Sequence, residues 1–351
     1  MKSERCFITS VKPGDTLARP VIRDDGYVIL AENTMLTLGQ ISRLRNLNIA
    51  FVDIWRPNEA SAGAPPPDPS TPEGFASYYD QTIIQLKTAF SRMRFFKEVP
   101  AGELEELVAK KINVLINASG VIHHLSAVER KDDYTFHHSI NVAIICGVLG
   151  KWMGIQGSDL RELVLAGLLH DIGKTQIPLE VLNKPGKLTD SEMAMMRLHT
   201  THGYSLLLNI SAISRSIART VLEHHERCDG SGYPYAIKAN DIHLYAKIIA
   251  VADTYDAMTS DRVYQSKRTP FQVVETISQE MFAKLEPSIC TVFLNNVHEV
   301  FLGTTVYLSN GMEAEVVFLG RYSASRPVVR TASGQFIDLE TAKDISIVSI
   351  A

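Results

Sequence analysis

Histidine and aspartate residues recur in this sequence where apolar helical segments end. The clearest case is His170-Asp171, which follows the apolar run 163–169 and is followed at once by Ile172-Gly173-Lys174. A carboxylate and an imidazole at the wall of a core need a partner, because an unpaired buried charge is costly. A metal ion is the obvious candidate. Lys174, one turn further on, indicates either a phosphate contact or a solvated lysine at a helix end.

Other segments repeat this pattern. Either histidine of His137-His138 could lie on a helix surface, but His138 shares a face with Val142 and Ile145, so we expect it to point inward. Asp253 follows the apolar run 248–252 in a mostly apolar helix, where only a paired carboxylate is tolerable. The remaining segments are a helix with an N-cap signature at 189–192 that leads to His199 and His202, and the pair His224-His225.

Adjacent helical residues point about 100° apart, so His224 and His225 are unsuited to chelating one ion symmetrically. They serve different ions, or one of them faces a substrate. The glycine-rich segment 229–234 that follows is either a plain turn or a loop whose backbone amides approach a phosphate or a base.

These residues together favour hydrolytic metal chemistry. The set is a mixture of imidazoles and carboxylates without a thiolate, which favours Fe, Mn or Zn in a hydrolytic centre and argues against a structural zinc finger. Asp171 could bridge two cations through its two oxygens. Two adjacent ions would bridge a hydroxide, lower its pKa and hold the attacked phosphorus and its leaving oxygen in line.

The composition is that of a globular protein with two or three domains. The chain has 351 residues, of which 45% are hydrophobic and 21% charged. A net charge of −4 does not suggest a duplex nucleic acid partner. Four scattered cysteines fit reduced thiols. The best membrane candidate, 140–155, is shorter than the ~20 residues of a span, so we expect a cytoplasmic protein without membrane insertion.

The elements that must position these residues are mainly helical. A small β-rich module is expected over 1–56, a Pro-rich linker over 57–74, a helical domain over 75–302 and a small β element over 303–351. Within the helical domain, apolar periodicity predicts helices over 75–96 and 103–128. The turn at Ser309-Asn310-Gly311 predicts a hairpin.

The motifs of 134–268 resemble those of HD-GYP domain proteins, a branch of the HD metal-dependent phosphohydrolases. The resemblance rests on His138-Ser139, on His170-Asp171 with Lys174, on segment 184–189, and on His199 with Gly203. It continues in four further strings, namely His224-His225-Glu226-Arg227, segment 229–234, Ala252-Asp253 and Asp261-Arg262.

The resemblance implies an all-helical catalytic domain that hydrolyses cyclic di-GMP to pGpG, GMP or both. It implies that Asp171 and Lys174 are catalytic, that Lys174 and Arg262 contact phosphate, and that the loop Gly232-Tyr233-Pro234 lies at the substrate mouth. The metal ligands that it implies are His138, His170, Asp171, His199, His224, His225 and Asp253.

Two departures from the family pattern change these expectations. Members that bind three metals have a glutamate four residues before the first histidine ligand, where this chain has Tyr134. We therefore expect two divalent ions, with Fe or Mn favoured, and no third. After Tyr264, Gln265 and Ser266 delay the positive charge that relatives often place there, which predicts a different phosphate contact.

Two alternatives to this phosphodiesterase stay open. One is a sensor or adaptor that binds the nucleotide, or a diguanylate cyclase of the GGDEF class, without turnover. The other is hydrolysis of another cyclic dinucleotide such as cyclic GMP-AMP. A homodimer is a further expectation.

Overall fold

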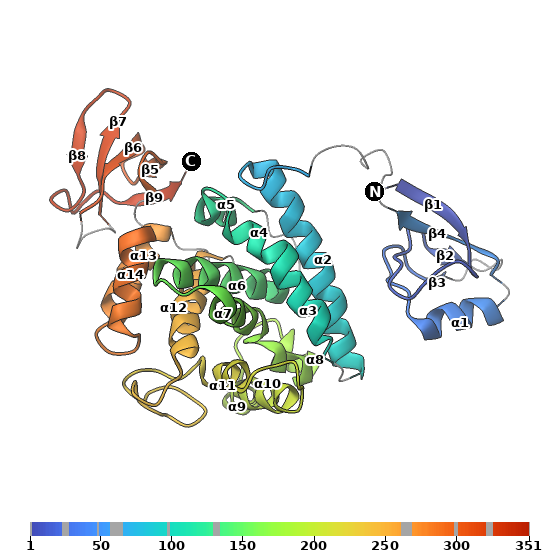
Figure 1. Cartoon of the computed structure of the whole chain (residues 1–351). Coiled ribbons are helices and arrows are strands. Elements are labelled where there is room, and N and C mark those ends of the chain that lie inside the picture. The colour runs from blue at the N-terminus through green and yellow to red at the C-terminus, as the bar shows by residue number, and fades with distance from the viewer. Residues whose placement is uncertain are drawn as a thin grey trace. The chain divides into compact units, whose positions relative to one another are not determined.

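The computed structural model describes residues 2–22, 28–47, 49–56, 66–96, 99–128, 134–260, 269–297, 301–320 and 326–350. The chain forms two compact units, Met1–Pro66 and Pro67–Ala351 (Figure 1). Within the described residues, no helix is both long and apolar enough to cross a membrane.

The first unit is a small β-rich fold with one helix. Strand β1 (Lys2–Phe7) pairs antiparallel with β4 (Phe51–Arg56), and β2 (Val21–Ile22) pairs antiparallel with β3 (Val28–Leu30). Helix α1 (Leu38–Asn46) begins with a capping box at Thr37. Leu17, Leu44 and Ile54 are fully buried in the core of this unit, which is separate from the core of the second unit.

The second unit begins with α2 (Pro72–Phe96), so the last three residues of the expected linker range are helical. The next helices are α3 (Ala101–Leu107), a π-helical turn (Val108–Ile112), α4 (Asn113–Ile116) and α5 (Val121–Ala127). The prediction of one helix over 103–128 is wrong, because the chain leaves the helix after Ile116. Gly120, with φ of 69°, starts α5 in a left-handed conformation that glycine adopts easily.

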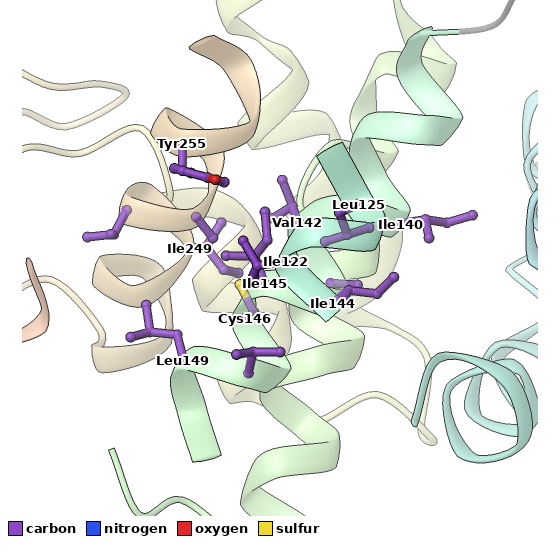
Figure 2. Close-up of a cluster of buried hydrophobic side chains, with 14 of the residues drawn as sticks. Ile122, Leu125, Ile140, Val142, Ile144, Ile145, Cys146, Leu149, Ile249 and Tyr255 are labelled. Atoms are coloured by element: carbon purple, nitrogen blue, oxygen red, sulfur yellow. The ribbon is translucent and has the colours of Figure 1, made fainter. Parts of the chain in front are cut away.

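Three helices form the centre of this unit, namely α6 (Tyr134–Trp152), α7 (Gly157–Leu169) and α12 (Leu244–Thr259). Figure 2 shows Val142, Ile145 and Leu149 of α6 meeting Ile249 and Tyr255 of α12. On the other side of α6, the helix α7 approaches closely because residue 167 is glycine. A Cβ at that position would lie 3.1 Å from the Ala143 Cα. This packing holds the end of α7 beside α6.

The segments after α7 wrap around its end. They are a 3₁₀ turn, η3 (Ile172–Gln176), followed by α8 (Leu179–Leu182), α9 (Asp190–Arg197), α10 (His199–Leu208) and α11 (Arg215–Glu223). A Cβ on Gly173 would overlap the His199 carbonyl oxygen, so glycine is required where η3 meets α10. Helix α9 begins with the predicted capping box at Thr189. Helices α13 (Pro270–Glu280) and α14 (Pro287–Val297) follow α12.

A five-stranded antiparallel sheet of order β8-β7-β6-β5-β9 ends the chain. The strands are β5 (Thr305–Leu308), β6 (Glu313–Phe318), β7 (Val328–Thr331), β8 (Phe336–Asp338) and β9 (Ile347–Ile350). The predicted hairpin at Gly311 is present between β5 and β6, whereas β9 was not predicted. Val306, Val316 and Val329 of this sheet belong to the same core cluster as the helices.

Candidate metal centre

Elements far apart in the sequence bring their histidines and aspartates together at one place. Two groups among the described residues could each hold a metal ion, and they share one carboxylate, that of Asp171. The first group is His138, His170 and Asp171. The second is Asp171, His199, His224 and His225. All of these side chains are buried except that of His225, which is partly buried.

Three of these imidazoles are oriented by nearby backbone carbonyls. The Nδ1 atoms of His170, His199 and His224 each lie 2.7 to 2.8 Å from the backbone carbonyl three residues earlier. Those carbonyls belong to Gly167, Met196 and Val221. A carbonyl only accepts, so each Nδ1 carries the proton and each neutral ring presents a lone pair on Nε2.

These Nε2 atoms face one another across the centre. The Nε2 atoms of His138 and His170 are 3.2 Å apart, and those of His199 and His224 are 3.3 Å apart. Two nitrogen lone pairs at this separation repel unless a proton or a cation lies between them. Since protein metal ions are commonly bound through imidazole Nε2, the arrangement is suited to cations.

Asp171 turns one oxygen toward each group. Its Oδ2 lies 3.3 Å from His170 Nε2 and accepts a hydrogen bond from Lys174 Nζ at 2.6 Å. Its Oδ1 lies 3.4 Å from His199 Nε2, is buried, and has no hydrogen-bond partner among the described residues. A buried carboxylate oxygen without a partner is costly, and a bound cation would remove that cost. The donor set therefore fits a pair of divalent ions bridged by Asp171.

Charge and burial favour the protonation states that metal binding requires. Burial lowers the pKa of His199 to about 4 and holds the pKa values of His224 and His225 well below their usual range. Burial opposes ionisation of Asp171, but Lys174 and His170 hold its pKa well below the usual range. The second group is therefore neutral at its imidazoles and anionic at Asp171.

His138 differs from the other imidazoles. Burial lowers its pKa, but hydrogen bonds and charges from Asp253 and Asp256 outweigh burial and raise the pKa to about 9. Asp253 Oδ1 lies 3.2 Å from His138 Nε2, and Asp256 Oδ2 lies 2.7 Å from His138 Nδ1. Asp253 thus lies at the edge of the first group, where its carboxylate could also bind an ion that is held by His138 Nε2.

A cavity of about 370 Å³ opens onto this centre. Five predicted site residues line it, namely His138, Asp171, Lys174, His225 and Asp253. Its other walls are formed by Arg227, Thr254, Ala257, Met258, Thr276 and Glu280. The cavity combines the metal-binding side chains with two cations, which suits an anionic substrate.

Comparison with known proteins identifies the domain that holds this centre. Residues 118–289 match the family model described as HD domain. The chain contains an HD domain. The match covers helices α5 to α13 and all seven predicted metal ligands, and the predicted membership of this superfamily is confirmed. An HD domain implies divalent metal binding, which agrees with the two ligand groups.

Curated relatives of the HD domain are named as phosphodiesterases. A cyclic di-GMP phosphodiesterase of Pseudomonas aeruginosa is 33% identical over 222 residues, which are 63% of this chain and 53% of that protein. The 3'3'-cGAMP-specific phosphodiesterase 1 of Vibrio cholerae is 34% identical over 177 residues, which are 50% of this chain and 41% of that protein. The chain thus spans about half the length of the curated relatives it matches.

A solved structure shows the same fold. Bd1817, an HDG"Y"P protein from Bdellovibrio bacteriovorus, has a TM-score of 0.57 to this chain at 14% identity. The match covers 85% of this chain and 100% of that one. Together with the helices described above, it confirms the predicted fold class, a mainly helical HD-type domain with small β-rich elements.

The glycine-rich loop of the HD domain folds back onto the metal-binding turn. A Cβ on Gly232 would overlap the backbone of Glu226 and Arg227, which explains why glycine is needed there. The buried Glu226 Oε1 accepts a hydrogen bond from the Tyr235 backbone amide at 2.7 Å. These contacts fix the loop against the residues that follow His225.

Tyr233 rests on the metal centre itself. Its ring centroid lies 4.7 Å from that of His225, and the Arg197 guanidinium lies 5.1 Å above the ring. Gly232, Tyr233 and Pro234 are not among the described residues that line the 370 Å³ cavity. In this structure the loop therefore braces His225, and its predicted contact with substrate stays a prediction.

Three predicted features of the site lie outside the described residues. They are Arg262, the departure from the family pattern at Gln265 and Ser266, and the side chain of Tyr134, which begins α6. Sequence reasoning assigned no role to Arg227, which lines the cavity beside His225. It also assigned none to Asp256, which contacts His138, or to Asn141, which donates to Asp256. The available signal for Asp256 was its spacing, one helical turn after Asp253 on an apolar helix.

Proposed function

We propose that this HD domain is a metal-dependent phosphodiesterase that hydrolyses cyclic di-GMP to pGpG, GMP or both. The observation that carries the proposal is the pair of ligand groups sharing Asp171 at the wall of a cavity that also contains Lys174 and Arg227. The names of the relatives support the substrate class, since several are cyclic di-GMP phosphodiesterases.

Seven residues would hold two divalent ions, namely His138, His170, Asp171, His199, His224, His225 and Asp253. The ions would supply an activated water and neutralise charge on the phosphate. The mixed imidazole and carboxylate ligands favour Fe or Mn. The two ligand groups support two ions, and a third is not expected because position 134 is tyrosine. Elemental analysis of anaerobically purified protein measures both the identity and the number of the ions.

Lys174 and Arg227 provide the positive charge for the substrate. Lys174 donates to Asp171, and its side chain is 24% exposed toward the cavity, so other ammonium protons are available to a phosphate oxygen. Arg227 donates to the His224 and Glu226 carbonyls through Nη1 and adds a guanidinium to the same cavity. Lys174 therefore both fixes the shared carboxylate and attracts the phosphodiester. Arg262 would add a further phosphate contact, and the loop Gly232-Tyr233-Pro234 would border the substrate.

The test is incubation of Mn-loaded or Fe-loaded protein with cyclic di-GMP, followed by chromatography of the products. We expect pGpG or GMP to form. Unchanged substrate with both metals supplied would contradict the proposal. Tight nucleotide binding without turnover would instead favour the sensor or adaptor alternative.

Hydrolysis of cyclic GMP-AMP is the second candidate, favoured by relatives of Vibrio cholerae that are named specific for that nucleotide. Parallel assays with both nucleotides distinguish the candidates. A higher kcat/KM for cyclic di-GMP supports our proposal, and a higher kcat/KM for cyclic GMP-AMP replaces it. A GGDEF partner, a homodimer and a cytoplasmic location stay predictions, testable by co-purification, light scattering and cell fractionation.

A further inference from the structure

Asp256 is a buried carboxylate that does not belong to either ligand group. Asp256 lies on the apolar helix α12 and is 1% exposed. Its Oδ2 lies 2.7 Å from the Nδ1 atom of His138, and its Oδ1 accepts a hydrogen bond of 2.7 Å from Asn141 Nδ2. Both oxygens of this carboxylate are therefore bound to side chains of α6.

The same set of hydrogen bonds continues into a third helix. Asn141 is 1% exposed, and its Oδ1 accepts a hydrogen bond of 2.7 Å from the hydroxyl of Tyr79. Tyr79 lies on α2 and is fully buried. A buried chain of side chains thus runs from Tyr79 through Asn141 and Asp256 to His138, and it joins α2, α6 and α12.

The carboxylate of Asp256 determines the donor and the acceptor of each hydrogen bond in this chain. An ionised carboxylate only accepts, so Asn141 must turn its NH₂ toward Asp256 and its carbonyl toward Tyr79. For the same reason His138 must donate through Nδ1. In the tautomer with one proton, Nε2 then presents a lone pair toward His170 Nε2, which lies 3.2 Å away.

We propose that Asp256 and Asn141 are positioning residues that fix the tautomer and ring orientation of His138 for metal binding. The inference rests on the proposed metal centre. The other three oriented imidazoles donate to backbone carbonyls three residues earlier in the sequence, but His138, near the start of α6, uses a carboxylate from α12 instead. Such partners of metal-binding histidines also raise the basicity of the ring.

Four proteins test this arrangement. They are the wild type, Asp256→Asn, Asn141→Asp and the double exchange, which combines the two substitutions. Asp256→Asn places two amides side by side, so a donor faces a donor or Asn141 turns away from the Tyr79 hydroxyl proton. Asn141→Asp places two carboxylates side by side in a buried site. In the double exchange the new carboxylate accepts from Tyr79 and from the new amide, whose carbonyl accepts from His138 Nδ1.

The readouts are Mn²⁺ affinity by calorimetry and the rate of cyclic di-GMP hydrolysis. We expect each single variant to bind Mn²⁺ roughly 10- to 100-fold more weakly, as is typical when such partners are changed. The double exchange should bind more tightly than either single variant. A role confined to joining the helices would lower the thermal midpoint of the metal-free protein without this recovery of affinity.

Ile249→Val is the matched control, because Ile249 is buried on the same helix in the apolar cluster of Figure 2. It should lower the thermal midpoint and leave the Mn²⁺ affinity unchanged. Tyr79→Phe is a milder variant that removes only the hydroxyl, so it keeps the test valid if the other variants do not fold. It should weaken Mn²⁺ binding by a smaller factor than Asp256→Asn.

The outcomes separate the two proposals. Wild-type affinity in Asp256→Asn, or a double exchange no better than the weaker single variant, would overturn the positioning role alone. If Asp256→Asn does not fold, wild-type affinity in Tyr79→Phe would overturn it. A wild-type protein that binds neither Mn²⁺ nor Fe²⁺ would overturn the metal centre and, with it, the role of this chain of side chains.

Discussion

The imidazoles of the metal centre are held in two different ways. His170, His199 and His224 each donate to a carbonyl three residues earlier in the sequence. His138, which shares a ligand group with His170, is instead held by Asp256, which is 118 positions away in the sequence. The first three imidazoles are oriented by local backbone geometry, whereas His138 depends on the packing of α6 against α12.

This difference predicts how each imidazole responds to change. A histidine that donates to a nearby backbone carbonyl keeps its orientation as long as that turn of the backbone is intact. His138 keeps its orientation only while two other helices are in place. The centre therefore combines three locally oriented imidazoles with one whose orientation depends on tertiary structure, and Asp171 connects the two ligand groups to which they belong.

Changing Asp171→Ala should have the largest effect, because among the described residues Asp171 is the one carboxylate that belongs to both ligand groups. We expect metal retention and hydrolysis to be lost together, with hydrolysis falling by more than the ~100-fold typical of losing an indirect partner. Elemental analysis and product chromatography measure both. Asp159→Ala, an exposed aspartate in the first turn of α7, is the control and should retain both. Activity that persists in metal-free Asp171→Ala would contradict the role of Asp171.

Changing one histidine in each ligand group should separate the two ions. His138→Ala removes a ligand of the first group only, and His199→Ala removes a ligand of the second group only. We expect each variant to retain about one ion instead of two, because the other group keeps all its ligands. The measurement is metal content after dialysis. Loss of both ions in either variant would show that the two ligand groups bind metal as one unit.

Changing Gly173→Ala should destabilise the fold around His199, one of the locally oriented imidazoles. The added Cβ would overlap the His199 carbonyl, and overpacking of this kind costs about 1–3 kcal/mol or more. Gly102→Ala on α3 is the matched control, since its Cβ meets nothing within 4 Å. Gly102→Ala should stabilise the protein by about 0.4–1 kcal/mol, because alanine lowers the conformational entropy of the unfolded chain. Chemical unfolding measures both, and equal midpoints for the two variants would contradict this reading of the contact.

The smallest effect is expected at the capping box of α9, a purely local feature. Hydrogen bonds from Lys184 and Thr189 lower the pKa of Glu192 to about 2 from its ordinary value near 4.5. The stability that this carboxylate contributes is complete above pH 4.5 and is lost as the pH falls toward 2. The thermal midpoint of Glu192→Gln should be slightly below wild type at pH 7, and the difference should narrow below pH 4.5. A difference that does not change with pH would show that the charge of Glu192 is unimportant.

The locally built features were those that the sequence predicts well. The ends of apolar helices at His170 and His224, the capping box at Thr189 and the hairpin at Gly311 depend on neighbouring residues, and all are present. The break at Gly120 was missed because apolar periodicity continues across it. Strand β9 was missed because it pairs with β5, about 40 residues earlier in the chain.

The parts of the site that were missed depend on tertiary contacts. Asp256 and Asn141 lie on different helices, and nothing in either local sequence shows that they meet. Arg227 adjoins a predicted ligand, but only the folded cavity shows that it faces the same space as Lys174. Residue types and spacing therefore predicted the ligands, whereas the residues that orient and surround them required the packing of α6, α12 and α13.

The most direct test of the shared carboxylate is anomalous X-ray diffraction from crystals of Mn-loaded protein. Our account predicts two Mn²⁺ peaks, roughly 3.5–4 Å apart, as in known two-metal sites. Each peak should lie within bonding distance of one oxygen of Asp171, with one peak beside His138 and His170 and the other beside His199 and His224. A single peak, or two peaks that do not share Asp171, would contradict the account.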